Sequence, residues 1–253
     1  MAGFSIMNAH LPVSLDRSPL LESIFEIRFE TSIPSAGDLL PGILFLKLKE
    51  SYPNIEALPI SNVPRSIREQ DPALVFQPSH RLIGNNMIVQ IGDRVLSISA
   101  QNYPGWEAFK SAIIQLLDVA FETGFIDKLC RYSFRYVNLL PKIEGSPEMS
   151  LLNLDIAVSG SPPLERGLQL RFEQDDNDYT TIIQIALQSS LQQPDMNSVF
   201  GVLVDVDTLM SNPSPDFLSS ISRHLDPCHA ALKTAFFSII SDLALQNMHP
   251  VYQ

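Results

Sequence analysis

Cysteine and long apolar runs are scarce in this sequence of 253 residues, and both absences exclude classes of protein. The two cysteines, Cys130 and Cys228, cannot form the disulfide framework on which small secreted domains depend, and they fit a reducing cytoplasm. The apolar stretches at 42–46 and 199–204 are far shorter than the roughly 20 residues that cross a bilayer. The N-terminus also lacks a basic region followed by an apolar core. We therefore predict no secretory signal, no membrane helix and a cytoplasmic location.

The motifs of several common enzyme classes are missing as well. The sequence has no G-x-S-x-G turn, which places the nucleophile of many serine hydrolases, no P-loop, and no glycine pattern for dinucleotides. Serine hydrolase, nucleotide hydrolase and Rossmann-type functions are therefore unsupported. We expect no cofactor, and the balance of the motifs is against an enzyme without deciding the question.

Basic residues are scarce in the C-terminal part. Residues 1–142 carry 13 Lys and Arg against 14 Asp and Glu, whereas residues 143–253 carry 4 against 14, a net charge of −10. Nucleic acid is a disfavoured ligand of this part, because binding to phosphates requires a footprint of lysine and arginine. The excess of carboxylates indicates either a solvated acidic face that keeps the protein soluble or a surface for a basic partner.

Alternating strands are the clearest positive feature. In SIFEIRFET, residues 23–31, apolar residues alternate with charged ones, which is the period-two pattern of a strand with one buried face. LCRYSFRYVNLLP at 129–141 and LQLRFE at 168–173 repeat the pattern. The polar faces of the three runs carry Arg28, Arg135 and Arg171. If these arginines share a sheet face, they can either bind a phosphate or carboxylate through paired donors or pair with neighbouring acids such as Glu26, Glu30 and Glu173.

The order of elements predicts an internal duplication. A strand over 24–31 leads to a helix ended by Pro53, to strand candidates at 74–77, 86–91 and 94–100, and to an amphipathic helix that begins at Trp106 and has Gly124 at its C-cap. The order restarts with a strand over 131–139 and strand candidates at 155–159, 167–173, 179–188 and 199–207. A last helix has Asp226 as its N-cap and Pro227 as its first residue.

We therefore predict an α+β fold, in which an internally duplicated antiparallel sheet has amphipathic helices packed on one face. The halves are expected to be residues 1–127 and 128–253, either as two units or as one intimately packed domain. The arginine-bearing strands would open the halves, so Arg28 and Arg135 should occupy equivalent positions. The second half lacks a clear counterpart of the first helix.

Three clusters resemble metal sites. Asp205 and Asp207 share a strand face, as the carboxylates that hold magnesium in nucleotidyl transfer do, but the glycine and serine turn that accompanies such pairs is missing. A cluster that resembles a zinc site is broken by a helix start at Asp226; its members are His224, Cys228 and His229. FEQDDNDYT lacks the spacing of an EF-hand loop and indicates a polar hairpin turn. We predict no metal site.

Four motifs resemble those of a sporadically distributed family of uncharacterised bacterial proteins, namely PLLESIFEIRFE, FRYVN, LVDVD and HAALKTAFFSII. The resemblance covers most of the chain and implies a bacterial cytoplasmic protein. Patchy distribution in such families often accompanies mobile or defensive gene neighbourhoods. The resemblance therefore also implies an antitoxin, an immunity protein or another defence component.

Together these observations favour a non-enzymatic interaction protein whose acidic C-terminal half binds a basic protein. The candidate contacts are the acids of the predicted hairpin turn, because a hairpin tip is accessible and its charges act together; they are Glu173, Asp175, Asp176 and Asp178. Two alternatives stay open: a small-molecule or nucleotide-binding module that uses the arginine face or the cleft between sheet and helices, and a metal-dependent enzyme that uses Asp205 and Asp207. Formation of a homo-oligomer also stays open.

Overall fold

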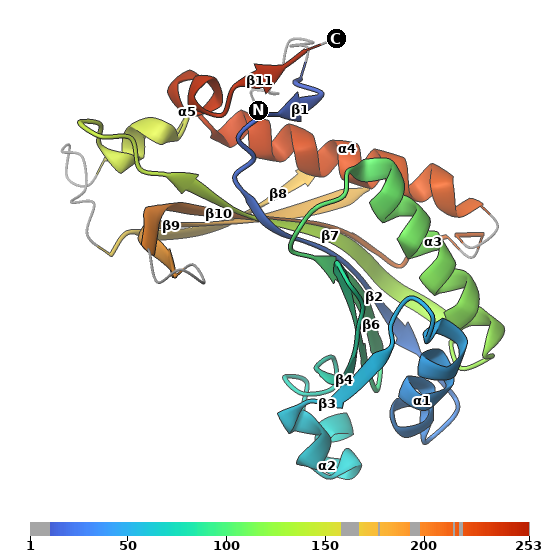
Figure 1. Cartoon of the computed structure of the whole chain (residues 1–253). Coiled ribbons are helices and arrows are strands. Elements are labelled where there is room, and N and C mark those ends of the chain that lie inside the picture. The colour runs from blue at the N-terminus through green and yellow to red at the C-terminus, as the bar shows by residue number, and fades with distance from the viewer. Residues whose placement is uncertain are drawn as a thin grey trace.

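Nine antiparallel strands form the main sheet (Figure 1). The computed structural model describes residues 11–157, 167–176, 178–192, 198–214, 216–217 and 220–252. The strands lie in the order β3-β4-β5-β6-β2-β7-β10-β9-β8. Their bounds are β2 (Leu20–Glu30), β3 (Asn54–Ala57), β4 (Pro78–Ile83), β5 (Met87–Gly92), β6 (Val95–Ala100), β7 (Lys128–Pro141), β8 (Gln169–Asp176), β9 (Tyr179–Gln192) and β10 (Ser198–Ser211). Together with the helices described below, this sheet confirms the predicted α+β fold.

The strand order is symmetric about the central pair, β2 and β7. From β2 outward the order is β6, β5 and β4, and from β7 outward it is β10, β9 and β8, so the two halves use their strands in the same way. Glu26 lies opposite Ser133 in this pair, and Arg28 and Arg135 each lie two residues further along their strands. The two arginines therefore lie on the same face of the central pair, and their equivalence in the two halves stays a prediction. Among the described residues, β3 has no counterpart in the second half.

Three helices cover one face of the sheet (Figure 1). α1 (Ala36–Leu48) packs on β4 and β5, α4 (Ile221–Ile239) packs on β7, β9 and β10, and α3 (Trp106–Glu122) lies between them. The alternating residues under these helices form one hydrophobic core, to which Phe25, Phe134 and Val204 contribute from neighbouring strands. Because this core crosses the β2–β7 pair, the predicted boundary at residues 127 and 128 separates two halves of one continuous core.

Smaller elements complete the chain. They are the helices α2 (Arg65–Gln70) and α5 (Asp242–Asn247), the 3-10 turns η1 (Pro59–Asn62) and η2 (Glu148–Leu151), and the paired strands β1 (Ser14–Leu15) and β11 (Pro250–Val251). In the described part of the second half, η2 stands where the first half has α1. None of the helices in the described ranges combines the length and apolar character needed to span a bilayer.

Two strand predictions fail in the connections. Residues 74–77 form a turn, because the Asp71 carbonyl accepts the backbone N–H groups of Leu74 and Val75, at 2.9 and 3.0 Å, and the Asp71 side chain accepts that of Ala73 at 2.8 Å. An aspartate that bonds its own following backbone in this way competes with strand formation. Of the predicted strand at 155–159, residues 155–157 have no regular structure, and residues 158 and 159 lie outside the described ranges.

The last helix begins earlier than predicted. α4 starts at Ile221, so Pro227 lies inside the helix and Asp226 is not its N-cap. The buried residues Leu225, Cys228 and Leu232 continue the helical periodicity on both sides of the proline. The Asp226 carboxylate instead binds α3, accepting hydrogen bonds from Trp106 Nε1 at 2.9 Å and Lys110 Nζ at 2.7 Å. The Asp226 side chain, which the sequence pattern predicted to cap the helix, therefore makes a tertiary contact with α3 instead.

Candidate functional site

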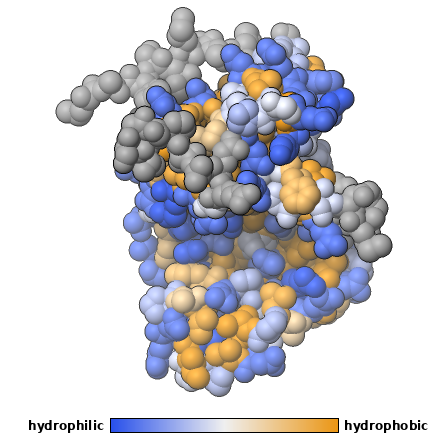
Figure 2. Space-filling model, turned by 90° about the vertical axis from the view of Figure 1, so that its left-hand side faces the viewer, coloured by the Kyte–Doolittle hydropathy of each residue, from blue (hydrophilic) through white to orange (hydrophobic). Residues whose placement is uncertain are grey.

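The sheet face opposite α1, α3 and α4, called the open face below, is the candidate site. The molecule is hollowed on the side shown in Figure 2, where hydrophilic and hydrophobic residues lie side by side. The strand register aligns one residue from each of the nine strands in a row across the open face, and every residue of this row except Leu209 is polar. The row is Glu56, Arg81, Gln90, Ser97, Glu26, Ser133, Leu209, Thr180 and Asp175. Half-buried apolar residues, including Ile24, Val137 and Ile182, lie beside it.

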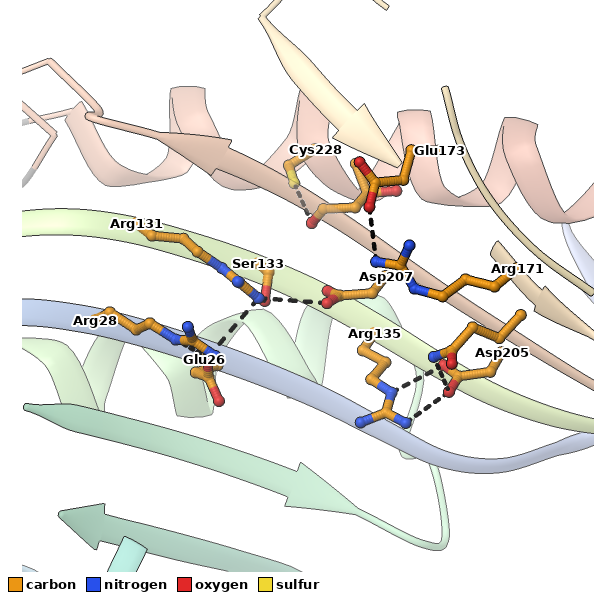
Figure 3. A network of polar contacts seen from close by, with 12 residues as sticks. Glu26, Arg28, Arg131, Ser133, Arg135, Arg171, Glu173, Asp205, Asp207 and Cys228 are labelled. Carbon is orange, nitrogen blue, oxygen red and sulfur yellow. Dashed lines mark hydrogen bonds and ion pairs between the residues drawn. The ribbon is translucent and has the colours of Figure 1, made fainter. Parts of the chain in front are cut away.

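Ion pairs occupy the centre of the open face (Figure 3). Arg135 on β7 binds Asp205 on β10 with two parallel hydrogen bonds, Nε to Oδ1 at 2.8 Å and Nη2 to Oδ2 at 2.6 Å. Arg131 donates to Asp207 Oδ2 at 3.3 Å, and its Nη2 lies 3.9 Å from Glu26 Oε1. The strands β2, β7 and β10 are therefore joined by side chains as well as by their backbones.

Asp207 is the most perturbed carboxyl of this network. Burial raises its pKa above the ordinary value, and Arg131 only partly offsets that effect. Two buried polar atoms, Arg131 Nε and Asp207 Oδ1, have no hydrogen-bond partner among the described residues. The Arg131–Asp207 pair therefore has fewer hydrogen bonds than the Arg135–Asp205 pair. The hydrogen bonds to Asp205 raise the pKa of Arg135.

The three predicted anion-binding arginines share the open face, but each already has an acidic partner. Arg28 Nε donates to Glu26 at 2.8 Å and its guanidinium lies 4.5 Å from the centre of the Phe76 ring. Arg135 binds Asp205, and Arg171 Nη2 donates to Glu173 at 2.6 Å. An incoming phosphate would therefore compete with a carboxylate at each arginine. This arrangement favours ion pairing among neighbours, the simpler of the two expectations for these residues.

The predicted acidic turn is a hairpin tip at the edge of the sheet. Its acids Glu173, Asp175, Asp176 and Asp178 are all exposed. β8 ends at Asp176 and β9 begins at Tyr179, so a two-residue connection joins the strands. Asp175 accepts a hydrogen bond from Thr180 Oγ1 at 2.7 Å. The structure therefore brings together the four residues predicted to contact a partner.

Asp205 and Asp207 lie on one face of β10, as predicted, but arginines fill the positions in front of their carboxylates. We expect Mg²⁺ or Mn²⁺ to leave the melting temperature of the wild type unchanged, because a ligand that binds only the native state would raise it. Differential scanning fluorimetry over a range of metal concentrations measures this. A metal-dependent rise that the Asp205→Asn, Asp207→Asn double variant loses would contradict the expectation.

The cluster that resembles a zinc site lies on one helix, whereas the sequence argument placed His224 before the helix start. Because α4 begins at Ile221, His224 and Cys228 are one turn apart within it. Cys228 is fully buried, its thiol donates to the Thr208 carbonyl at 3.5 Å, and burial raises its pKa. His229 stacks on Trp106. Among the described residues, no group of three or more His, Cys, Asp or Glu side chains is arranged to hold a metal ion.

Sequence reasoning missed a buried ion pair beyond the open face. Arg68 on α2 binds Asp93, in the turn between β5 and β6, with Nε to Oδ2 at 2.7 Å and Nη2 to Oδ1 at 2.9 Å. Asp93 also borders a cavity of about 230 Å³ near the start of α1, lined by Thr31, Arg65 and Arg94 among others. No local pattern links positions 68 and 93. The sequence predicted the turn that contains Asp93 but did not indicate that Arg68 binds it.

Comparison with known proteins adds no family to these observations. No family model matches the chain, and no curated protein matches it.

Proposed function

We propose that this protein is a non-enzymatic interaction component that binds a basic protein partner through its acidic C-terminal half. The observation that carries the proposal is the exposed hairpin tip, on which Glu173, Asp175, Asp176 and Asp178 gather at the edge of the sheet. Arg171 also lies on β8 and forms an ion pair with Glu173. The tip therefore presents a net negative charge to an approaching molecule.

The charge balance of the open face supports the same assignment. Arg28, Arg131 and Arg135 are each matched by a carboxylate there, so the centre of the face attracts neither sign strongly. At the hairpin tip four exposed acids lie beside Arg171, so negative charge exceeds the positive charge of that cation. Complementary potentials accelerate encounter and exclude partners of the wrong sign. A basic partner would therefore be steered to the tip and could then extend over the apolar and polar residues of the open face.

The alternatives have less support from the contacts. In a nucleotide-binding module the phosphates would compete with the acids that already bind Arg28, Arg135 and Arg171. A metal-dependent enzyme would need Asp205 and Asp207 to be free of Arg135 and Arg131. Within the interaction class, an antitoxin or immunity protein is the role that the resemblance in sequence suggests, and neutralising a basic toxin is a task that an acidic tip would serve.

Reversing the tip charge tests the proposal. The Asp175→Lys, Asp176→Lys, Asp178→Lys variant is expected to slow association with a basic partner by about tenfold or more, whereas single reversals change the binding free energy by about 1 kcal/mol or less. The partner is isolated with the untagged protein from its host, and association rates are measured by stopped flow at increasing salt. Rates should fall as salt rises, since charges are screened over roughly 8 Å at physiological ionic strength.

A matched control carries the same change of charge elsewhere. Asp118, Glu144 and Asp155 are exposed and lie outside the hairpin, and Glu144 follows the opposite end of the β7–β10 pair. Their triple reversal to lysine should slow association much less than reversal of the tip. If the rate is indifferent to salt and to both reversals, the acidic half is only a solvated surface and the proposal fails.

A further inference from the structure

β8 is an edge strand, the last in the order of the main sheet. It pairs with β9, and no other strand of the described residues lies along its outer edge. At eight residues it is twice as long as β3, the four-residue strand at the opposite end of the sheet. An open edge of this length presents a row of backbone donors and acceptors that another strand can extend. It contains no proline, which is a common device for blocking such pairing.

The hydrogen bonds of β8 identify which residues face the open edge. The Leu187 N–H donates to the Leu168 carbonyl at 3.1 Å, so residue 168 directs its backbone groups toward β9. Backbone groups alternate in direction along a strand, and therefore the other even-numbered residues of β8 also face β9. The outward groups belong to the odd-numbered residues Gln169, Arg171, Glu173 and Asp175.

We propose that the open edge of β8 binds the same edge of a second copy of this chain, in an antiparallel pair with Phe172 opposite Phe172. This register places Arg171 of each copy directly opposite Glu173 of the other. It also pairs the outward backbone groups of residues 169, 171, 173 and 175 with one another. The two nine-stranded sheets then become one continuous sheet about a two-fold axis, and the interface is self-complementary as such symmetry requires.

Charge selects this register from its neighbours. A pair centred on Arg171 would place the two arginines opposite each other, which is destabilising. One centred on Glu173 would place the two glutamates opposite each other, between two Arg171–Asp175 pairs. Centring on Gln174 would oppose Glu173 and Asp175. A centre at Leu170 would leave Arg171 opposite Gln169 without an acid. Only the centre at Phe172 forms two opposite-charge pairs without opposing like charges at the outward positions.

The acidic tips do not prevent this association. In the proposed register, Asp175 lies opposite Gln169, six residues from its own counterpart, which is about 20 Å along a strand. That distance exceeds the Debye length of about 8 Å, so repulsion between the tips is largely screened. Both tips remain at the outer ends of the interface. Glu173 belongs to both proposals, because in the dimer it pairs with Arg171 of the second copy, whereas Asp176 and Asp178 stay at the outer end of the interface.

Charge exchange provides the test, measured by sedimentation velocity across roughly 1 µM to 1 mM, where interfaces of modest size dissociate. The wild type is expected to form a reversible dimer. With Arg171→Glu alone, a glutamate at position 171 of each copy faces Glu173 of the other, and with Glu173→Arg alone, arginines face each other at the same positions. Each variant should therefore weaken the dimer by about tenfold or more. The doubly exchanged variant restores both opposite-charge pairs and should restore association.

A mixture of the two single variants gives the decisive result. In their heterodimer each Arg171→Glu chain meets a Glu173→Arg chain, and both cross-strand pairs have opposite charges again. The mixture should therefore dimerise more tightly than either variant alone, and a change within one chain cannot produce that outcome. Thermal unfolding of each variant checks that the fold is retained. A wild type that stays monomeric, or a dimer unaffected by these changes, would overturn the proposal.

Discussion

Replacing Asp93 with alanine is expected to cost about 3 kcal/mol of unfolding free energy, because it leaves the Arg68 guanidinium buried without its main partner. Arg68 and Asp93 expose only 4% and 5% of their side chains. Arg68 Nη1 also donates to the Val63 carbonyl at 2.9 Å, and this neutral contact cannot replace the carboxylate. Asp38 lies 3.6 Å from Arg68 Nη2 but is largely exposed, which places the cost at the lower end of the range for broken buried pairs.

Urea unfolding measures this cost as a lower midpoint at constant slope. The double variant Arg68→Ala, Asp93→Ala removes both charges and is expected to be no less stable than Asp93→Ala alone, since the uncompensated charge is gone. A Glu56→Ala variant is the matched control, because it breaks the exposed pair with Arg81 and should cost about 1 kcal/mol or less. If Asp93→Ala lowers the unfolding free energy as little as the control does, the buried pair contributes little to stability.

The alternation of side chains explains why the sheet was predictable. In β2 and β7 every second residue enters the core, as at Phe25, Ile27, Tyr132 and Phe134, so the pattern identified strands and their buried faces. The same pattern placed Arg28, Arg135 and Arg171 on one face. It also offered Glu26 and Glu173 as partners, since each lies two residues from its arginine on the same strand. It could not give Asp205 as the partner of Arg135, because that pair depends on the register between β7 and β10.

Features held by distant contacts were not predictable in the same way. The start of α4 was misplaced because Asp226 and Pro227 resemble a helix start, whereas Lys110 and Trp106 of α3 bind the Asp226 carboxylate. The Arg68–Asp93 pair joins positions 25 residues apart through a helix and a turn, which no local spacing encodes. The partners of a polar side chain thus follow from the assembled fold, while its face on a strand follows from the sequence.

His229 on α4 is half-buried, and its surroundings create a pH dependence of stability. Its ring stacks on the single tryptophan, Trp106, with centroids 3.8 Å apart and planes inclined by 6°. Burial lowers the pKa of His229 from 6.5 to about 4, with a smaller contribution from Lys233 in the next turn and partial opposition from Asp226. The native state therefore holds this imidazole neutral under conditions in which the unfolded chain binds a proton.

Stability is expected to fall as pH decreases from 6.5 to about 4, by up to about 3 kcal/mol from this residue. The sign follows from proton uptake: above pH 6.5 neither state is charged at His229, and between the two pKa values only the unfolded state binds the proton. His229→Phe retains an aromatic ring against Trp106 without a titratable group, so its unfolding free energy should lose this slope. Urea unfolding of both proteins across that pH range isolates the difference, because other groups such as Asp207 titrate in both. A direct NMR titration of His229 gives the native pKa, and parallel pH profiles for the two proteins would contradict the prediction.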